Sequence, residues 1–382
     1  MVAEKASDHL LMVDLKAQYL RYKKEIDSAL IQVVESAQYI NGPQVQSFSN
    51  ALESYLSVEK VIPCGNGTDA LQLALMALDL QPGDEVITTA FSFVASAEVI
   101  ALLGLTPVFA DIDSKTYNID VDDIERRITP KTKVVLPVHL FGQPADMTSI
   151  MELANNHGLY VIEDVAQSLG ASCMYKGVRY KAGTIGHIGC TSFFPSKNLA
   201  CFGDGGACFT NDDYLGSRMK MLASHGAGKQ YHHDIVGINS RLDTIQAAIL
   251  NIKLPLLDDF ITARRTVAGV YDSILKDVEQ INIPYNAEGV LHSYNQYTIA
   301  VKNGKRDELK KKLELKGIPT RVYYPVPLHR QQAFSNYLDS NLSLPNAQIA
   351  CKEVLSLPMH TEMSSDDARY IALSIKELLE NL

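Results

Sequence analysis

From Val61 onward, short apolar segments alternate with amphipathic ones, and this alternation restricts the chain to a narrow set of folds. The apolar runs have the length of buried strands, whereas the amphipathic runs repeat with the period of a helix. We expect strands at 85–88, 106–110, 133–138 and 160–163, and helices at 69–78, 95–103 and 147–157. Such alternation predicts an α/β fold with a mostly parallel sheet covered by helices on both faces.

The length of 382 residues exceeds one typical domain, so a large domain with a smaller one attached is expected. Two helical patterns, at 17–37 and 45–56, are separated by Asn41-Gly42-Pro43 and predict an N-terminal arm. We place the arm and large domain at 1–257 and a small α/β domain at 258–382. In the small domain we expect helices at 260–275, 306–315 and 366–379, and strands at 296–301 and 319–323.

The formal net charge of −9 and the pI near 5.6 argue against nucleic acid as a partner, because proteins that bind it carry a basic surface. No signal peptide and no apolar run long enough to span a bilayer are recognised, so no membrane partner is expected. The six cysteines are scattered, without the spacing of a zinc site or a disulfide framework. We therefore expect reduced thiols, no metal and a cytoplasmic location.

Lys197 lies between the aromatic pair Phe193-Phe194 and the glycine-rich turn 203–206. Poor solvation in such surroundings lowers the pKa of an amine and leaves it able to attack a carbonyl carbon. The segment therefore indicates imine chemistry. The alternative is an ordinary surface lysine in a loop.

In doubly covered sheets, ligands bind beyond the carboxyl ends of the strands, so the residues that follow each strand are candidates for a binding site. The turn 65–71 leads into a helix whose N-terminal N–H groups suit a phosphate, although Thr68 or Asp69 could simply cap that helix. Phe91 and Phe93 follow the next strand. Either ring could stack on a heterocycle or pack in the core.

Asp164 ends the apolar segment 159–163, where a buried carboxylate needs a cationic partner. A protonated pyridine nitrogen is such a partner, whereas the alternative is an aspartate that caps a helix. Ser192 precedes Lys197 by five positions and is, on its own, an ordinary strand serine.

Taken together, 65–71, 89–97, 163–167, 191–206 and 237–243 resemble, in the same order, the motifs of the DegT/DnrJ/StrS family of sugar aminotransferases that use pyridoxal phosphate. The resemblance extends over nearly the whole chain. It implies the type I aminotransferase fold, with a mixed, mainly parallel seven-stranded sheet in the large domain and a small C-terminal α/β domain.

The resemblance also implies a role for each matching residue. Lys197 forms the Schiff base with the cofactor and acts as the catalytic acid/base. Asp164 holds the pyridinium proton, Gln167 lies near the ring hydroxyl, and Phe93, ahead of Phe91, stacks on the ring. The cofactor phosphate is bound by Gly67, Thr68 and Ser192, and by Asn239 of the neighbouring subunit, so a homodimer with shared active sites is expected.

Three residues are substrate-side candidates. A guanidinium such as that of Arg241 suits a diphosphate or a sugar carboxylate. The alternative is that Arg241 merely forms an ion pair with Asp243. The loop 323–329 combines tyrosines, prolines and a histidine, and it resembles a family loop near the nucleotide-sugar. We therefore include Tyr324 and His329, while His329 could equally be a satisfied surface histidine.

The implied reaction transfers an amine, with glutamate as donor, to a keto nucleotide-sugar. The segment 193–199, followed by Gly203-Asp204-Gly205-Gly206, is most similar to family members that act on 3-oxo sugars of the UDP-2-acetamido-3-oxo-glucuronate type. The product would serve surface polysaccharide or lipopolysaccharide biosynthesis. The alternatives are an aminotransferase for a dTDP-3-oxo or 4-oxo-6-deoxy sugar, an amino-acid aminotransferase of the same fold, and a regulatory protein that binds pyridoxal phosphate.

Overall fold

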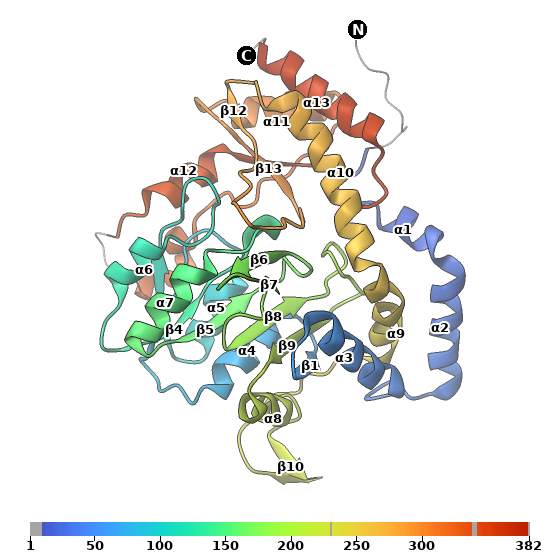
Figure 1. Ribbon diagram of the computed structural model, residues 1–382, viewed down its shortest axis with the longest axis vertical. Coiled ribbons are helices and arrows are strands. Elements are labelled where there is room, and N and C mark those ends of the chain that lie inside the picture. The colour runs from blue at the N-terminus through green and yellow to red at the C-terminus, as the bar shows by residue number, and fades with distance from the viewer. Residues whose placement is uncertain (1–9, 230, 338–341, 381–382) are drawn as a thin grey trace.

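The computed structural model describes residues 10–229, 231–337 and 342–380, and it is built around one seven-stranded sheet (Figure 1). Across the sheet the strands are β1 Lys60–Cys64, β9 Gly206–Thr210, β8 Ile188–Ser192, β5 Tyr160–Asp164, β4 Thr132–Leu136, β2 Glu85–Thr89 and β3 Thr106–Ala110. Strand β9 is antiparallel to β1 and β8, whereas the other neighbours are parallel. The mixed, mainly parallel sheet expected from the sequence is confirmed.

Helices cover both faces of this sheet. Val86 in β2 packs in a cluster with α4 and α5, whereas the next residue, Ile87, packs in a cluster with α6 and α7. Because both faces of β2 are buried against helices, its side chains must be apolar on both sides, which explains the continuous hydrophobic run in its sequence. The helices are α4 Gly67–Ala77, α5 Ala95–Leu102, α6 Val121–Arg127, α7 Met147–His157 and α8 Asp213–Leu222.

The N-terminal arm consists of α1 Leu15–Arg21, α2 Lys23–Ser36 and α3 Pro43–Leu56. Helices α2 and α3 both pack against α9 Thr244–Lys253. Leu10 reaches the core of the smaller unit at the top of Figure 1, so the arm contacts both parts of the molecule.

The smaller unit is formed by the C-terminal part of the chain. Its elements are β12 Ile281–Asn282, β13 Tyr297–Val301, β14 Val354–Leu357, α10 Leu257–Leu275, α11 Arg306–Leu315 and α13 Ser365–Glu380. Helix α10 spans both parts, because Leu257 packs in the core beside β9 whereas Leu275 packs beside β13.

The expected strand at 319–323 is wrong. Arg321 makes only a single bridge, to Ser356, and the third strand of the smaller sheet is β14, which the sequence analysis did not identify. Strand β14 directly follows α12 Pro345–Glu353 without a turn between them, so no loop signal marks its beginning.

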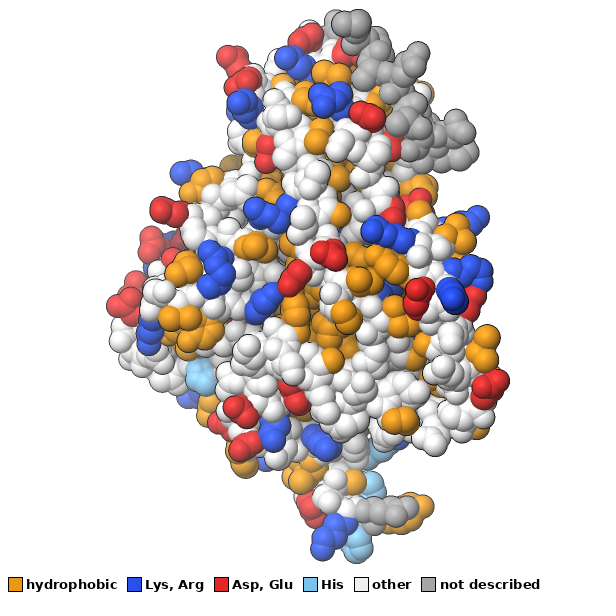
Figure 2. Space-filling view, turned by 45° about the vertical axis from the view of Figure 1, so that its right-hand side comes forward, with side chains coloured by type: hydrophobic (Ala, Val, Ile, Leu, Met, Phe, Trp, Pro, Cys, Tyr) orange, Lys and Arg blue, Asp and Glu red, His pale blue; other side chains and the backbone are white. Residues whose placement is uncertain are grey.

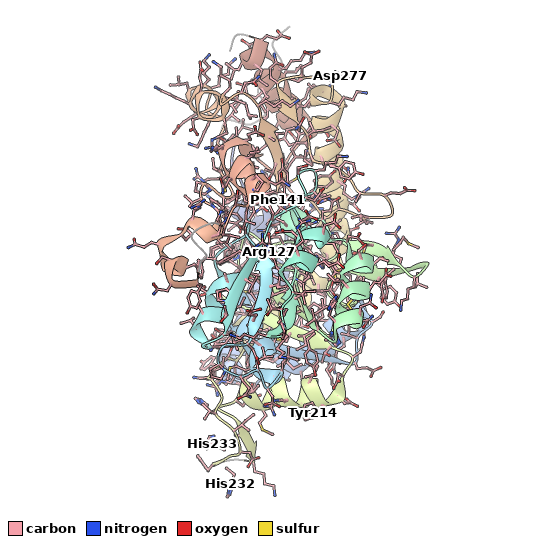
Figure 3. The ribbon with its side chains drawn as sticks, turned by 90° about the vertical axis from the view of Figure 1, so that its left-hand side faces the viewer. Arg127, Phe141, Tyr214, His232, His233 and Asp277 are labelled. Atoms are coloured by element: carbon pink, nitrogen blue, oxygen red, sulfur yellow. The ribbon has the colours of Figure 1, made fainter. Side chains whose placement is uncertain are left out.

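Two hairpins extend from the main body. The first is β6 Ser172–Tyr175 with β7 Val178–Lys181, and the second is β10 Ala227–Lys229 with β11 His232–His233. Figure 3 shows His232 and His233 on the second hairpin, which projects from the bottom of the molecule. Among the described residues, no helix is long and apolar enough to cross a membrane.

Candidate active site

Lys197 follows β8 in a turn closed by a hydrogen bond from its own N–H to the Phe194 carbonyl oxygen, 2.9 Å away. The side chain is half-buried. Burial lowers the pKa of its amine below the usual 10.5, while the carboxylate of Asp164 opposes this shift. The structure therefore brings Lys197 and Asp164 together, as the sequence analysis expected, and favours the uncharged, nucleophilic form of the amine.

Asp164 is the last residue of β5 and is 7% exposed. Burial raises the pKa of its carboxyl group, and the N–H of Ala166, together with Lys197 and His139, counteracts this effect. The Ala166 N–H donates to Oδ1 over 3.0 Å. A cation placed against this carboxylate would lower its pKa and favour the charged form, which is the property required of a partner for a pyridinium nitrogen.

Gln167 lies in the turn after Asp164 and is held from two directions. Its Oε1 accepts the N–H of Phe141 over 2.7 Å, and its Nε2 donates to the Tyr324 hydroxyl over 3.1 Å. Figure 3 shows Phe141 between the sheet and the smaller unit. The hydrogen bonds place Tyr324 beside the carboxyl end of β5, so the structure joins this substrate-side candidate to the predicted cofactor residues.

The two phenylalanines after β2 differ sharply in exposure. Phe91 is fully buried, whereas the side chain of Phe93 is 56% exposed. Both rings lie near the ring of Tyr324, with centroids 6.0 and 6.5 Å away respectively. Phe91 is thus a core residue, and Phe93 is the one with a face available for stacking.

The N-terminus of α4 lies directly against Ser192 at the end of β8. A Cβ added at Gly67 would lie only 2.7 Å from the Ser192 Cβ, so this approach requires glycine. Asn66, and not Thr68 or Asp69, caps the helix by accepting the Asp69 N–H. The first N–H groups of a helix have no internal acceptor, so those of Gly67 and Thr68, with the Ser192 hydroxyl, form a donor set suited to phosphate.

Asn239 and Arg241 lie on a loop that Ser240 fastens to the α4 turn. The Ser240 hydroxyl accepts the Gly65 N–H over 2.9 Å and donates to Asp69 over 2.6 Å. Asn239 is exposed, and Arg241 lines a cavity of about 600 Å³. Among the described residues Arg241 forms no salt bridge, so the alternative pairing with Asp243 is absent.

His329 is not a surface residue, since its side chain is only 1% exposed. Its Nε2 lies 3.3 Å from the Nε2 of Gln348 on α12, and its Nδ1 has no hydrogen-bond partner among the described residues. Burial and the nearby Arg330 lower its pKa to about 4, so the ring is neutral at physiological pH. No contact joins its side chain to Lys197, Asp164 or Gln167 in the structure.

Sequence reasoning missed a buried histidine–glutamate pair next to Asp164. His139 and Glu163 are both fully buried and lie 2.8 Å apart, Nε2 to Oε2. The His139 Nδ1 accepts the Ala145 N–H, which leaves the ring proton on Nε2 facing Glu163. Burial alone would raise the pKa of Glu163, but His139 and the N–H groups of 185–186 lower it below 4.5. His139 directly follows the expected strand 133–138, so it belongs to the positions after strand ends where ligands bind in such sheets.

The loop that carries Lys197 is also fixed by residues of the C-terminal part. Asn198 donates from Nδ2 to Ser293 Oγ over 2.9 Å, and Asn295 donates to the Ser196 carbonyl over 3.2 Å. Ser293 and Asn295 lie outside every recognised motif, so sequence analysis could not have identified these anchoring contacts. No group of three metal-ligating side chains occurs among the described residues.

Known proteins share this fold and much of this sequence. The chain is 45% identical to the UDP-2-acetamido-2-deoxy-3-oxo-D-glucuronate aminotransferase of Pseudomonas aeruginosa, over 95% of this chain and 98% of that protein. It is 44% identical to a pleiotropic regulatory protein of Geobacillus stearothermophilus, over 96% and 97%. The structure of NtdA from Bacillus subtilis with bound cofactor PMP superposes with a TM-score of 0.91 at 30% identity, covering 99% of this chain and 87% of that one.

The family model for DegT/DnrJ/EryC1/StrS aminotransferases matches residues 21–376. The fold is accordingly the type I aminotransferase fold, and this family of aminotransferases depends on pyridoxal phosphate. The chain therefore belongs to the DegT/DnrJ/EryC1/StrS aminotransferase family.

Proposed function

We propose that this protein transfers an amine from glutamate to C3 of a nucleotide-sugar of the UDP-2-acetamido-3-oxo-glucuronate type. The observation that carries the proposal is the half-buried Lys197 amine, which lies within the electrostatic influence of Asp164. The choice of sugar is supported by the activity for which the Pseudomonas aeruginosa relative is named, and by that of an Acidithiobacillus ferrooxidans relative named for a 3-dehydro-UDP-N-acetylglucosamine.

The residues present fit pyridoxal phosphate. The donor set of Gly67, Thr68 and Ser192 suits the phosphate, and the close approach of Gly67 to Ser192 leaves no room for a side chain at this point. Asp164 offers a carboxylate for a protonated ring nitrogen, and Phe93 offers an exposed aromatic face. When bound, the cofactor supplies the electron sink that makes amino-group transfer possible.

Lys197 has two tasks in this proposal. Its Nζ holds the cofactor until the amino donor displaces it, and the freed amine then moves a proton to and from the reacting substrate carbon. Burial lowers the pKa of Nζ and thereby increases the fraction that can accept this proton. Burial raises the pKa of the Asp164 carboxyl group, and a protonated ring nitrogen facing it would favour its charged form.

On the substrate side we propose Tyr324, Arg241 and His329. The Tyr324 hydroxyl accepts a hydrogen bond from Gln167 and keeps its own proton for a substrate oxygen. The unpaired guanidinium of Arg241 suits a carboxylate or a diphosphate. His329 is buried beside α12, so we propose that it acts by supporting the loop 323–329.

Asn239 is exposed, and the cavity lined by Arg241 does not include Lys197, so we propose that both residues serve the site of a second copy in a homodimer. We place the large domain at 1–257 and the small domain at 258–382; residues 1–9 and 381–382 lie outside the described residues. We further propose a cytoplasmic enzyme whose amino-sugar product enters surface polysaccharide or lipopolysaccharide.

A second candidate function is regulation with retained cofactor binding, which is favoured by the name of the Geobacillus stearothermophilus relative. A third is amination of a dTDP-linked keto sugar, the activity named for a Streptomyces venezuelae relative that is 38% identical. Turnover separates these candidates, because a regulator binds the cofactor without converting any keto sugar.

The test begins with the absorbance spectrum of the purified protein supplied with pyridoxal phosphate. Borohydride reduction and peptide mapping should place the label on Lys197, and glutamate should bleach the visible band. Lys181, which lies in the β6–β7 hairpin, is an internal control and should remain unlabelled. A label on another lysine, or a protein that takes up no pyridoxal phosphate, would contradict the assignment. Keto sugars linked to UDP and dTDP are then compared as amino acceptors.

A further inference from the structure

We propose that the protein has a second ligand site, for a nucleoside diphosphate, in a cavity of about 620 Å³ between the β6–β7 hairpin, the end of α3 and the beginning of α10. These elements lie together toward the viewer in Figure 1. The volume is within the range of about 300–1,000 Å³ that small-molecule sites occupy. None of the residues assigned above to the cofactor or the sugar lines it.

Two guanidinium groups line this cavity without an acidic partner. Arg179 donates to Ser172 Oγ over 3.1 Å and to the Gly289 carbonyl over 3.3 Å, whereas Arg265 donates to the His292 carbonyl over 3.3 Å. These acceptors are neutral, and neither arginine forms a salt bridge among the described residues. Each guanidinium also keeps further N–H groups for an anion.

The third cation of the cavity is held in a fixed position. The Lys181 Nζ lies 3.0 Å from the Tyr55 hydroxyl and 4.1 Å from the centre of that ring, and it pairs with Asp258 at 3.4 Å. Tyr55 in turn donates to Asp258 over 2.6 Å. The described lining residues therefore include three cations but only one carboxylate, that of Asp258, which is already paired with Lys181.

The remaining wall is suited to the rest of a nucleotide. Val178, Tyr180, Ile261 and Leu291 provide apolar and aromatic surface, with Tyr180 and Val178 well exposed. Hydroxyl and amide groups of Ser57, Thr184 and Asn211 also line the cavity and suit ribose or phosphate oxygens. A cationic end beside an aromatic and apolar end matches a diphosphate joined to a nucleoside.

The surroundings favour a compact anion over a nucleic acid. On the face drawn in Figure 2, Lys and Arg side chains are interspersed with Asp and Glu, and the whole chain carries a formal net charge of −9. An extended polyanion needs a continuous basic surface, whereas a diphosphate needs only the local groups of this cavity.

The experiment is a calorimetric titration of the full chain with UDP, compared with UDP-N-acetylglucosamine. Arg179→Gln combined with Arg265→Gln should weaken one binding event by about tenfold or more, because two charge-assisted contacts are lost. Arg241→Gln should affect only the event at the proposed sugar site, and the exposed Arg369→Gln is the matched control. If UDP and UDP-N-acetylglucosamine bind equally, the site recognises the diphosphate. If only UDP binds, the ligand of the site is a free nucleotide.

Hydrogen–deuterium exchange on the unmodified protein provides a second readout that does not depend on the folding of the double arginine variant. UDP should protect 172–181, and Lys197→Ala should leave this protection unchanged, so the result is independent of whether the proposed transamination is correct. Unchanged exchange at 172–181, or UDP binding that the double variant leaves at its original affinity, would overturn the proposal.

Discussion

The side-chain amide of Gln167 donates a hydrogen bond to the hydroxyl of Tyr324, which is 3.1 Å away in space and 157 residues away in sequence. The same amide accepts the N–H of Phe141. The residue that we expect at the cofactor's ring hydroxyl is therefore fixed by two other segments of the chain. Its orientation depends on the C-terminal loop being in place.

Tyr324→Phe tests this dependence. The change keeps the ring against Phe91 and Phe93 but removes the acceptor of the Gln167 amide. We expect the binding free energy of pyridoxal phosphate to weaken by about 1 kcal/mol, so that its Kd, measured by absorbance titration, rises roughly fivefold. Tyr323→Phe is the matched control. Equal Kd values for the two variants would show that the bond to Gln167 does not orient the site.

The parts of the candidate site that are formed by residues close together in the sequence were predictable. Asp164 and Gln167 follow one buried strand, and the pattern that places them at its carboxyl end is local. The bond from Gln167 to Tyr324 and the anchoring of Asn198 on Ser293 join distant segments, and no local pattern encodes such pairings. Only the resemblance suggested that Tyr324 belongs at the site.

The errors in the fold have the same origin. The segment 319–323 has strand-like composition, yet whether it pairs depends on β14, which lies more than thirty residues later and hydrogen-bonds mainly to β13. The cap of α4 was misplaced by two or three residues, because Asn66, Thr68 and Asp69 are all good caps and only the geometry selects one.

Gly67→Ala tests the proposed phosphate site. The added methyl group would lie 2.7 Å from the Ser192 Cβ, so Ser192 and the start of α4 must move apart. We expect a weaker Kd for pyridoxal phosphate, by about tenfold, because the donor set is displaced. Gly269→Ala in α10 is the control, since a Cβ there meets no atom within 4 Å. That variant should gain about 0.5–1 kcal/mol of stability and keep its cofactor affinity.

Asp164→Asn tests the electrostatic role of the carboxylate at constant shape. Asparagine can still accept the Ala166 N–H but carries no charge for a protonated ring nitrogen. We expect turnover to fall by about 100-fold or more, in line with the loss of other charge-stabilising groups in active sites. Asp258→Asn, which alters a carboxylate outside the active site, should retain turnover. If Asp164→Asn turned over at the original rate, the charge of Asp164 would have no catalytic role.

Lys253 provides a prediction about stability and pH. Its side chain is 2% exposed, its Nζ donates to Gln18 over 2.9 Å, and it lies 4.8 Å from the Phe202 ring centre. Burial lowers the pKa of this amine from 10.5 to about 8. Between these two values the unfolded chain holds one proton more than the folded chain, so the contribution of Lys253 to stability rises with pH across this window.

Lys253→Met removes this titration while keeping a side chain of similar length and apolar character. The free energy of unfolding of the variant, relative to that of the unmodified protein, should therefore be highest at or below about pH 8. This difference should fall by up to about 3 kcal/mol as the pH approaches 10.5. The lost bond to Gln18 adds an offset that does not depend on pH. Urea unfolding of both proteins between about pH 7 and about pH 10 measures the difference. The exposed Lys352→Met is the matched control. A constant difference for Lys253→Met would mean that the buried amine stays charged in the folded protein.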